Sequence, residues 1–244
     1  MLVPAVNTPA LLAAWEEGVT QPALRRALIL LGMARPERSA AEWNHVSIGE
    51  RDRTLFRIRE ELFGSRIEAT AECPRCGERL ELAFGTNDIC AGDAEPPAPH
   101  ESLRLERAGY EVVYRLPTTA DLSEMGAGEG RNVLLKRCVE VARFGVQDVD
   151  AEGLPDEVVT AIAAGMAEAD PQAEVRIAVT CPSCSNEWSP MFDIVGFLWG
   201  EIEDWAERLL LDVHALASAY GWSERDIVAM SPRRRRFYLD MVGT

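Results

Sequence analysis

The sequence predicts an α+β protein with helical N- and C-terminal segments around a zinc-ribbon-like pair of β-hairpin knuckles. Two Cys-x-x-Cys motifs, Cys73 to Cys76 and Cys181 to Cys184, each lie between short alternating stretches that are typical of strands. Apolar residues recur at helical spacing before the first motif and after the second. The long stretch between the motifs mixes both patterns, and we expect it to form an α+β insertion.

The N-terminal segment, residues 1–64, is predicted to be helical. Thr8 followed by Pro9 is typical of an N-cap followed by a first-turn proline. A second helix is expected over residues 23–33, directly after Pro22.

Ser47 with Glu50 three residues later has the capping-box spacing and predicts the start of a third helix. This helix is expected to end at Gly64. Its apolar residues recur at helical spacing and should face the core: Leu55, Ile58, Leu62 and Phe63. Charged residues occupy the rest of the helix: Arg51, Arg53, Arg57, Arg59, Glu60 and Glu61.

The two motifs predict one structural zinc ion. Residues 65–90 form the first predicted knuckle and residues 173–193 the second. Two thiolates separated by two residues on a tight turn can fill two corners of a tetrahedron, and two such turns complete the ligand shell of Zn²⁺. The predicted ligands are Cys73, Cys76, Cys181 and Cys184.

Thiol–disulfide chemistry is the competing interpretation of a Cys-x-x-Cys motif, and it needs a helix directly after the motif. Residues 77–82 instead look extended, which favours the metal site over a dithiol oxidoreductase. Cys90 and Cys138 have no nearby cysteine partner, and Cys138 shares helical spacing with apolar neighbours. We interpret Cys138 as a buried structural thiol.

The insertion, residues 91–172, is predicted to begin with a proline-rich connector over residues 91–100. A hairpin should follow over residues 103–116, then helices over residues 132–144 and 156–169. Three glycines, Gly126, Gly128 and Gly130, are interpreted as a plain loop because no strand leads into them.

The C-terminal segment, residues 194–244, is predicted to be helical. One long helix carries an apolar stripe and ends at Gly221. Ser223 and then Ser231 with Pro232 should start two shorter helices. The stripe consists of Leu198, Ile202, Trp205, Leu209, Val213 and Leu216.

Composition excludes several classes of function. The chain has 244 residues and a net charge of −15, which disfavours nucleic acid as a partner because phosphates are repelled. No apolar run approaches the roughly 20 residues that cross a bilayer, and no signal-peptide pattern follows Met1, so we expect a cytoplasmic protein. Common hydrolase and nucleotide-binding motifs are absent, and the histidines lie far apart, so we expect no enzymatic activity.

A run of four arginines, residues 233–236, supports the alternative of a zinc-ribbon nucleic-acid-binding adaptor. Two short helices joined at Ser231 could resemble a helix-turn-helix. Consecutive residues point around the whole helix, however, and an arginine-rich segment can equally dock on an acidic protein surface. The acidic composition favours the protein partner.

Several stretches together resemble the baseplate proteins of contractile phage tails and related contractile injection systems. They cover most of the chain: residues 47–52 (SIGERD), 59–64 (REELFG), 73–77 (CPRCG), 115–122 (RLPTTADL), 181–184 (CPSC), 192–194 (FDI), 197–202 (FLWGEI) and 220–224 (YGWSE) through to 238–239 (YL). After the second motif, Ser185 stands where the family pattern has a glycine, which leaves the ligands unchanged.

The resemblance implies a non-enzymatic role, as a baseplate or hub component or as an assembly chaperone, in a phage-infected or bacterial cell. Partners would be baseplate or hub subunits, and a component, unlike a chaperone, would be incorporated in a tail particle. Tryptophan and arginine dominate interface hot spots, so the C-terminal helices offer candidate contacts, although the tryptophans could equally be core. These candidates are Trp199, Trp205, Trp222, Arg233 and Arg236. Self-association is left open.

Overall fold

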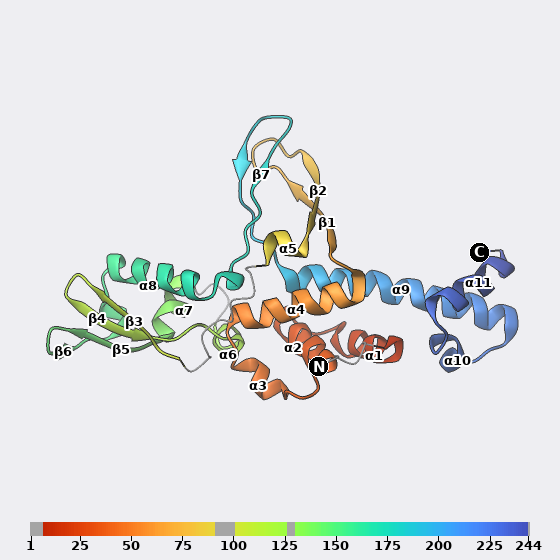
Figure 1. Cartoon of the computed structure of the whole chain (residues 1–244), viewed down its shortest axis with the longest axis horizontal. Coiled ribbons are helices and arrows are strands. Elements are labelled where there is room, and N and C mark those ends of the chain that lie inside the picture. The colour runs from red at the N-terminus through yellow and green to blue at the C-terminus, as the bar shows by residue number, and fades with distance from the viewer. Residues whose placement is uncertain (1–6, 91–100, 126–129, 244) are drawn as a thin grey trace. The chain divides into compact units, whose positions relative to one another are not determined.

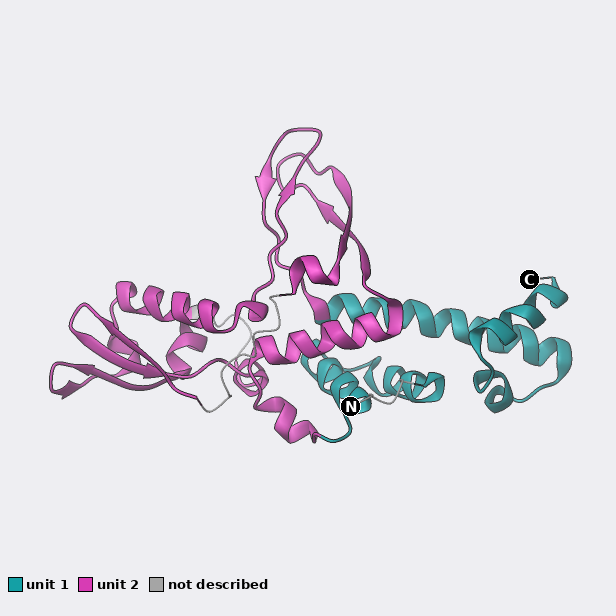
Figure 2. Ribbon diagram, in the orientation of Figure 1, with its two compact units in different colours: residues 1–37, 195–244 teal, residues 38–194 magenta. Residues whose placement is uncertain are grey.

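The computed structural model describes residues 7–90, 101–125 and 130–243. It divides into two compact units, residues 1–37 with 195–244 and residues 38–194 (Figure 2). The predicted connector over residues 91–100 and two of the loop glycines, Gly126 and Gly128, lie outside the described residues. Mixed helices and small sheets confirm the α+β class, while the finer division into five segments stays a prediction.

The first unit is helical, as Figure 1 shows. Its elements are α1 (Thr8–Gly18), α2 (Ala23–Ala34), α9 (Ile194–Tyr220), α10 (Glu224–Val228) and α11 (Pro232–Val242). The predicted N-cap of α1 was wrong by one residue: the Asn7 side chain accepts the N–H of Ala10, and Thr8 is already helical. Asn is as good an N-cap as Thr, so the position before Thr8 takes that role.

The predicted stripe of α9 is confirmed as the core of this unit. Leu209, Val213 and Leu216 are buried against Leu12 of α1 and Ile227 of α10. Helix α9 ends at Gly221, whose φ of +67° is a left-handed conformation that favours glycine. Ser223 and Ser231 each accept a backbone N–H three residues later, as expected for N-caps.

The second unit holds every strand that the structure describes. Its elements are α3 (Ala40–Asn44), α4 (Ile48–Phe63), β1 (Arg66–Glu72), β2 (Arg79–Gly85), α5 (Thr86–Ile89), β3 (Leu103–Arg107), β4 (Tyr110–Tyr114), α6 (Thr119–Ser123), α7 (Arg131–Arg137), β5 (Val139–Phe144), β6 (Gln147–Asp148), η1 (Ala151–Gly153), α8 (Asp156–Ala169), η2 (Pro171–Ala173), β7 (Val179–Thr180) and β8 (Glu187–Trp188). Strands β3 to β6 form an antiparallel sheet in chain order, and β1–β2 and β7–β8 are separate hairpins.

Helix α8 and the sheet share one core in the insertion. Val112 and Tyr114 of β4 pack with Val158 and Ile162 of α8, and all four side chains are buried. Gly165 lets α8 approach the sheet, because a Cβ there would lie 2.2 Å from the Tyr114 hydroxyl.

The helix predicted over residues 132–144 was wrong in its second half. Helix α7 ends at Arg137, and Val139–Phe144 is strand β5, paired antiparallel with β4. Residues 139–144 contain two valines and a phenylalanine, which suit a pleated sheet. The spacing of the apolar residues fits a helix or a strand, and the pairing with β4 selects the strand. Cys138 lies at the junction and is fully buried, which confirms the interpretation of a buried thiol.

Helix α4 is held at its N-terminus by two other parts of the unit. The N–H of Ile48 donates to the Pro117 carbonyl (3.1 Å), and the N–H of Gly49 donates to Asp170 (2.9 Å). These bonds satisfy donors that a helix end leaves without intrahelical partners. Three arginines that lie outside the apolar stripe are nevertheless buried: Arg51, Arg53 and Arg59.

Candidate metal centre

The first knuckle is a hairpin turn closed by strands β1 and β2. The strands pair along their whole length, from Arg66 opposite Gly85 to Glu72 opposite Arg79. Inside the turn, the N–H of Cys73 donates to the Glu78 carbonyl at 2.8 Å. The carbonyl of Cys73 accepts the N–H of Gly77 at 2.9 Å, which brings both cysteines to one side.

The second knuckle repeats these bonds. The N–H of Cys181 donates to the Asn186 carbonyl at 2.9 Å, and the Cys181 carbonyl accepts the N–H of Ser185 at 2.9 Å. Strands β7 and β8 are only two residues long, although apolar and polar residues alternate over residues 173–180 as in a longer strand. The Pro190 carbonyl accepts the N–H of Ile177, but proline has no N–H to donate in return, so the strand pairing is interrupted there.

The residue after each motif has a left-handed backbone. The φ angle is +74° at Gly77 and +54° at Ser185. Glycine adopts this conformation freely, whereas a residue with a Cβ is strained in it. The second knuckle therefore makes the same turn at a higher conformational cost.

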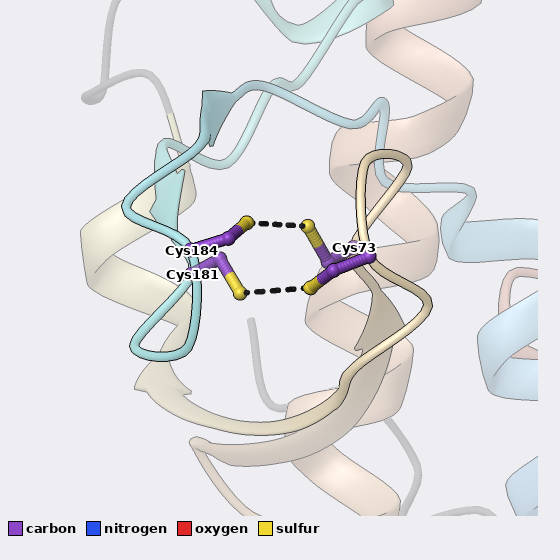
Figure 3. A group of neighbouring side chains, drawn as sticks. Cys73, Cys181 and Cys184 are labelled. Atoms are coloured by element: carbon purple, nitrogen blue, oxygen red, sulfur yellow. Dashed lines mark hydrogen bonds between the residues drawn. The ribbon is translucent and has the colours of Figure 1, made fainter.

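The two knuckles bring four thiols together, as predicted. The ligand atoms of Cys73, Cys76, Cys181 and Cys184 all lie within 4.8 Å of one another. Cys73 faces Cys184 with the sulfurs 3.7 Å apart (Figure 3). The Cys76 sulfur lies 3.6 Å from the Cys181 sulfur. A tetrahedral ion with metal–sulfur bonds of 2.3 Å would separate its ligands by about 3.8 Å, so the spacing suits such an ion.

The thiols differ in their tendency to ionise. Burial opposes ionisation of Cys73, but N–H groups of Arg75 and Cys76 outweigh it and lower the pKa of Cys73 to about 7. The Glu78 N–H favours the Cys76 thiolate, but the nearby Cys184 sulfur and burial raise the pKa of Cys76 to about 12. Full ionisation of the group therefore needs a cation, whose binding would release protons.

Aromatic contacts anchor the second knuckle to the rest of its unit. The Phe192 ring stacks on Phe56 of α4, with centroids 5.9 Å apart, and meets Phe84 of β2 edge-on at 5.8 Å. The chain that leaves the second knuckle is thus packed against the strand that leaves the first. This contact holds the two knuckles, and with them the two pairs of cysteines, next to each other.

The surroundings do not favour the redox interpretation. Strands β2 and β8, not helices, follow the two motifs, so neither motif has a helix N-terminus that would activate its thiolate. Cys90 and Cys138 are not part of the group. Burial raises the pKa of Cys138 to about 12, as expected for a structural thiol.

Residues 36–199 match the model of a protein family described as T4 bacteriophage base plate protein. The chain belongs to this baseplate family. The matched region of the baseplate protein contains α4, both knuckles and the whole insertion. No curated protein and no solved structure matches the chain.

The candidate partner residues of the baseplate protein differ in their exposure to solvent. Trp199 is buried, with Arg26 stacked 4.6 Å from its ring centroid, whereas Trp205 and Trp222 are half-buried. Arg233 and Arg236 are exposed. Their role in partner binding stays a prediction.

Sequence reasoning missed two exposed apolar residues on α11. Phe237 and Met241 are 63% and 66% exposed. They lie one turn apart on α11. Arg233, Phe237 and Met241 follow one another at intervals of four residues, and this spacing is the signal that could have found them. In the described parts of the chain, no helix is long and apolar enough to cross a membrane.

Proposed function

We propose that this chain is a non-enzymatic protein of a contractile-tail baseplate, a structural or hub component or an assembly chaperone, stabilised by one zinc ion. The observation that carries the proposal is the family match over residues 36–199, which contains both thiol pairs. Phage tails and contractile injection systems are the assemblies in question, and the cytoplasm is where the chain would act.

Zinc is proposed because the donor set consists of thiols alone. Four thiolates in tetrahedral spacing are the ligand set of structural zinc and are too soft for Mg²⁺ or Ca²⁺. With every position filled by sulfur, no open position remains for a water molecule or a substrate. The ion would therefore act as a clamp, as in a zinc ribbon, rather than as a catalyst.

The clamp would join chain segments that are far apart in sequence. Cys73 and Cys184 are separated by 111 residues, so the ion would close a loop that contains the whole insertion. Structural zinc contributes about 10 to 16 kcal/mol in small peptides, which is more than the entropy cost of bringing the two ends of such a loop together. The insertion would thus be fixed to α4 through its two ends.

Metal analysis of the reduced, purified chain tests the zinc. We expect one zinc per chain, loss of the ion in Cys76→Ser and Cys184→Ser, and retention in the control Cys90→Ser. A chain that folds and carries no zinc, or one that loses zinc only with Cys90, would contradict the proposal.

The partner surface is proposed to lie on α11. Arg233 lies one turn before Phe237 and Met241 one turn after it, so a guanidinium group borders an exposed apolar pair, while the exposed Arg236 adds positive charge to the same helix. Arginine and aromatic residues are typical of interface hot spots. An acidic protein surface with an apolar groove fits this face.

Nucleic acid fits the arginine run less well. Arg235 is buried and paired with Asp212 at 3.1 Å, and Arg234 lies over the Tyr238 ring at 5.8 Å. Two members of the run are therefore engaged within the fold. The adaptor function is accordingly not proposed.

Affinity capture from cells that assemble particles tests the baseplate role. We expect baseplate or hub subunits to be recovered with the chain, and less of them with a Phe237→Ala and Met241→Ala double variant. Leu211→Ala, an exposed apolar residue on α9, is the matched control. The chain's presence in purified particles identifies a component, and its absence identifies a chaperone; recovery of no such subunit overturns the proposal.

A further inference from the structure

The second unit contains a cavity of about 310 Å³ beside α4 and the start of α5. It lies apart from the thiol group, since it contains none of the four clustered cysteines. Its walls combine hydrogen-bond donors with one aromatic ring and one acid: Arg53, Phe56, Arg57, Glu60, Thr86, Asn87 and Cys90.

Thr86 supplies a buried hydroxyl to this cavity. The residue is 1% exposed, and its Oγ1 has no hydrogen-bond partner. Leaving such a group unsatisfied costs about 1 to 3 kcal/mol, so a buried orphan of this kind calls for a ligand or a water molecule. The N–H of Thr86 donates to the Ser65 carbonyl at 2.9 Å, which holds the backbone at the start of α5.

Two arginines from α4 supply positive charge. Arg53 and Arg57 are one helical turn apart, so both side chains reach the same cavity. Arg53 also acts on the fold, because its charge favours the ionised form of Asp170. Arg57 is exposed and remains available to a ligand.

The negative groups at the cavity limit what it can hold. Glu60 opposes part of the arginine charge. The Cys90 thiol adds none, because burial and then Glu60 raise its pKa and keep it neutral. Two arginines and one glutamate leave one net positive charge, which suits a monoanion better than a phosphate dianion.

We propose that this cavity binds a carboxylate with a short aliphatic arm, as carried by an acidic side chain of a protein partner. The planar group would pair with the Arg57 guanidinium, which matches carboxylates in geometry, and would accept the Thr86 hydroxyl. Asn87 can donate a further hydrogen bond. The Phe56 ring offers an apolar wall for the methylene groups. The proposal does not depend on the baseplate role.

Acetate and inorganic phosphate, titrated into the metal-loaded full chain in chloride-free buffer, test the site. Chemical shifts of the Arg57 side chain and the Thr86 amide report binding. We expect acetate to saturate at a Kd on the order of 1 mM, as its few atoms allow. Tighter binding of phosphate than of acetate would overturn the carboxylate assignment.

Two variants separate binding from folding. Arg57→Gln should weaken acetate binding at least tenfold, whereas the control Arg104→Gln, an exposed arginine on β3, should not. Thr86→Val removes the orphan hydroxyl, so the free chain should be as stable as the wild type or more stable, while acetate binding weakens. Destabilisation of the free chain by Thr86→Val, or unchanged binding in Arg57→Gln, would refute the site.

Discussion

The N–H of Gly49 donates to the carboxylate of Asp170 at 2.9 Å, across 121 residues of sequence. A Cβ at position 49 would lie 1.7 Å from Asp170 Oδ1, so only glycine admits the carboxylate there. Asp170 follows α8 directly, and Gly49 is in the first turn of α4. One hydrogen bond thus ties the insertion to the helix that precedes the first knuckle.

Gly49→Ala should destabilise the chain by about 2 to 4 kcal/mol, through overpacking and loss of a charge-assisted hydrogen bond. Gly32→Ala is the matched control, because nothing lies within 4 Å of a Cβ there. That change should stabilise α2 by up to about 1 kcal/mol. Urea unfolding of the metal-loaded chain measures both, and equal effects would contradict the close approach.

Asp170 should make stability depend on pH. Burial is the main cause that raises its pKa above 3.8, although the Gly49 N–H and the Ser47 side chain oppose the shift. The folded state then prefers the protonated form, so this contribution to stability is present below pH 3.8 and is lost as pH rises through the folded pKa.

Asp170→Asn keeps an acceptor for Gly49 but cannot ionise. Its free energy of unfolding, relative to the wild type, should therefore increase as pH rises from 3.8 through the folded pKa of Asp170, and then level off. The thiol group contributes equally to both proteins and cancels in the difference. Asp170→Ala should show the same trend at lower stability, and a difference independent of pH would sink this account.

Ser185 holds a left-handed conformation, with φ at +54°, where the first knuckle has Gly77. Ser185→Gly should stabilise the metal-loaded chain by about 1 kcal/mol, and Gly77→Ser should destabilise it by a similar amount. Thermal unfolding of both variants checks the signs. Two changes in the same direction would show that the turns are not equivalent.

Gly18 lies against the Trp199 ring, where a Cβ would come within 2.4 Å of it. Gly18→Ala should cost about 1 to 3 kcal/mol by displacing the indole. Gly200→Ala, on α9 with nothing within 4 Å of its Cβ, should have no such cost. Near-ultraviolet circular dichroism, which reports the tryptophan environment, should change only in the first variant.

Local signals in the sequence located much of the structure. Helix α8 has the predicted bounds, β1 and β2 flank Cys73 and Cys76 as expected, and the four cysteines meet. The short helix α3 was not predicted, although Ser39 and Glu42 have the capping-box spacing that starts it. Local patterns succeed where caps, turns and periodicity act within a few residues of one another.

The sequence by itself determined the ligand chemistry, the stripe of α9 and the family, because cysteine spacing and apolar periodicity are local properties of the chain. Tertiary structure alone decided that residues 139–144 form a strand, that Trp199 is buried and that Asp170 caps α4. Each of these depends on a partner distant in sequence, since a ladder, a packed ring or a long-range cap exists only when folding brings both members together.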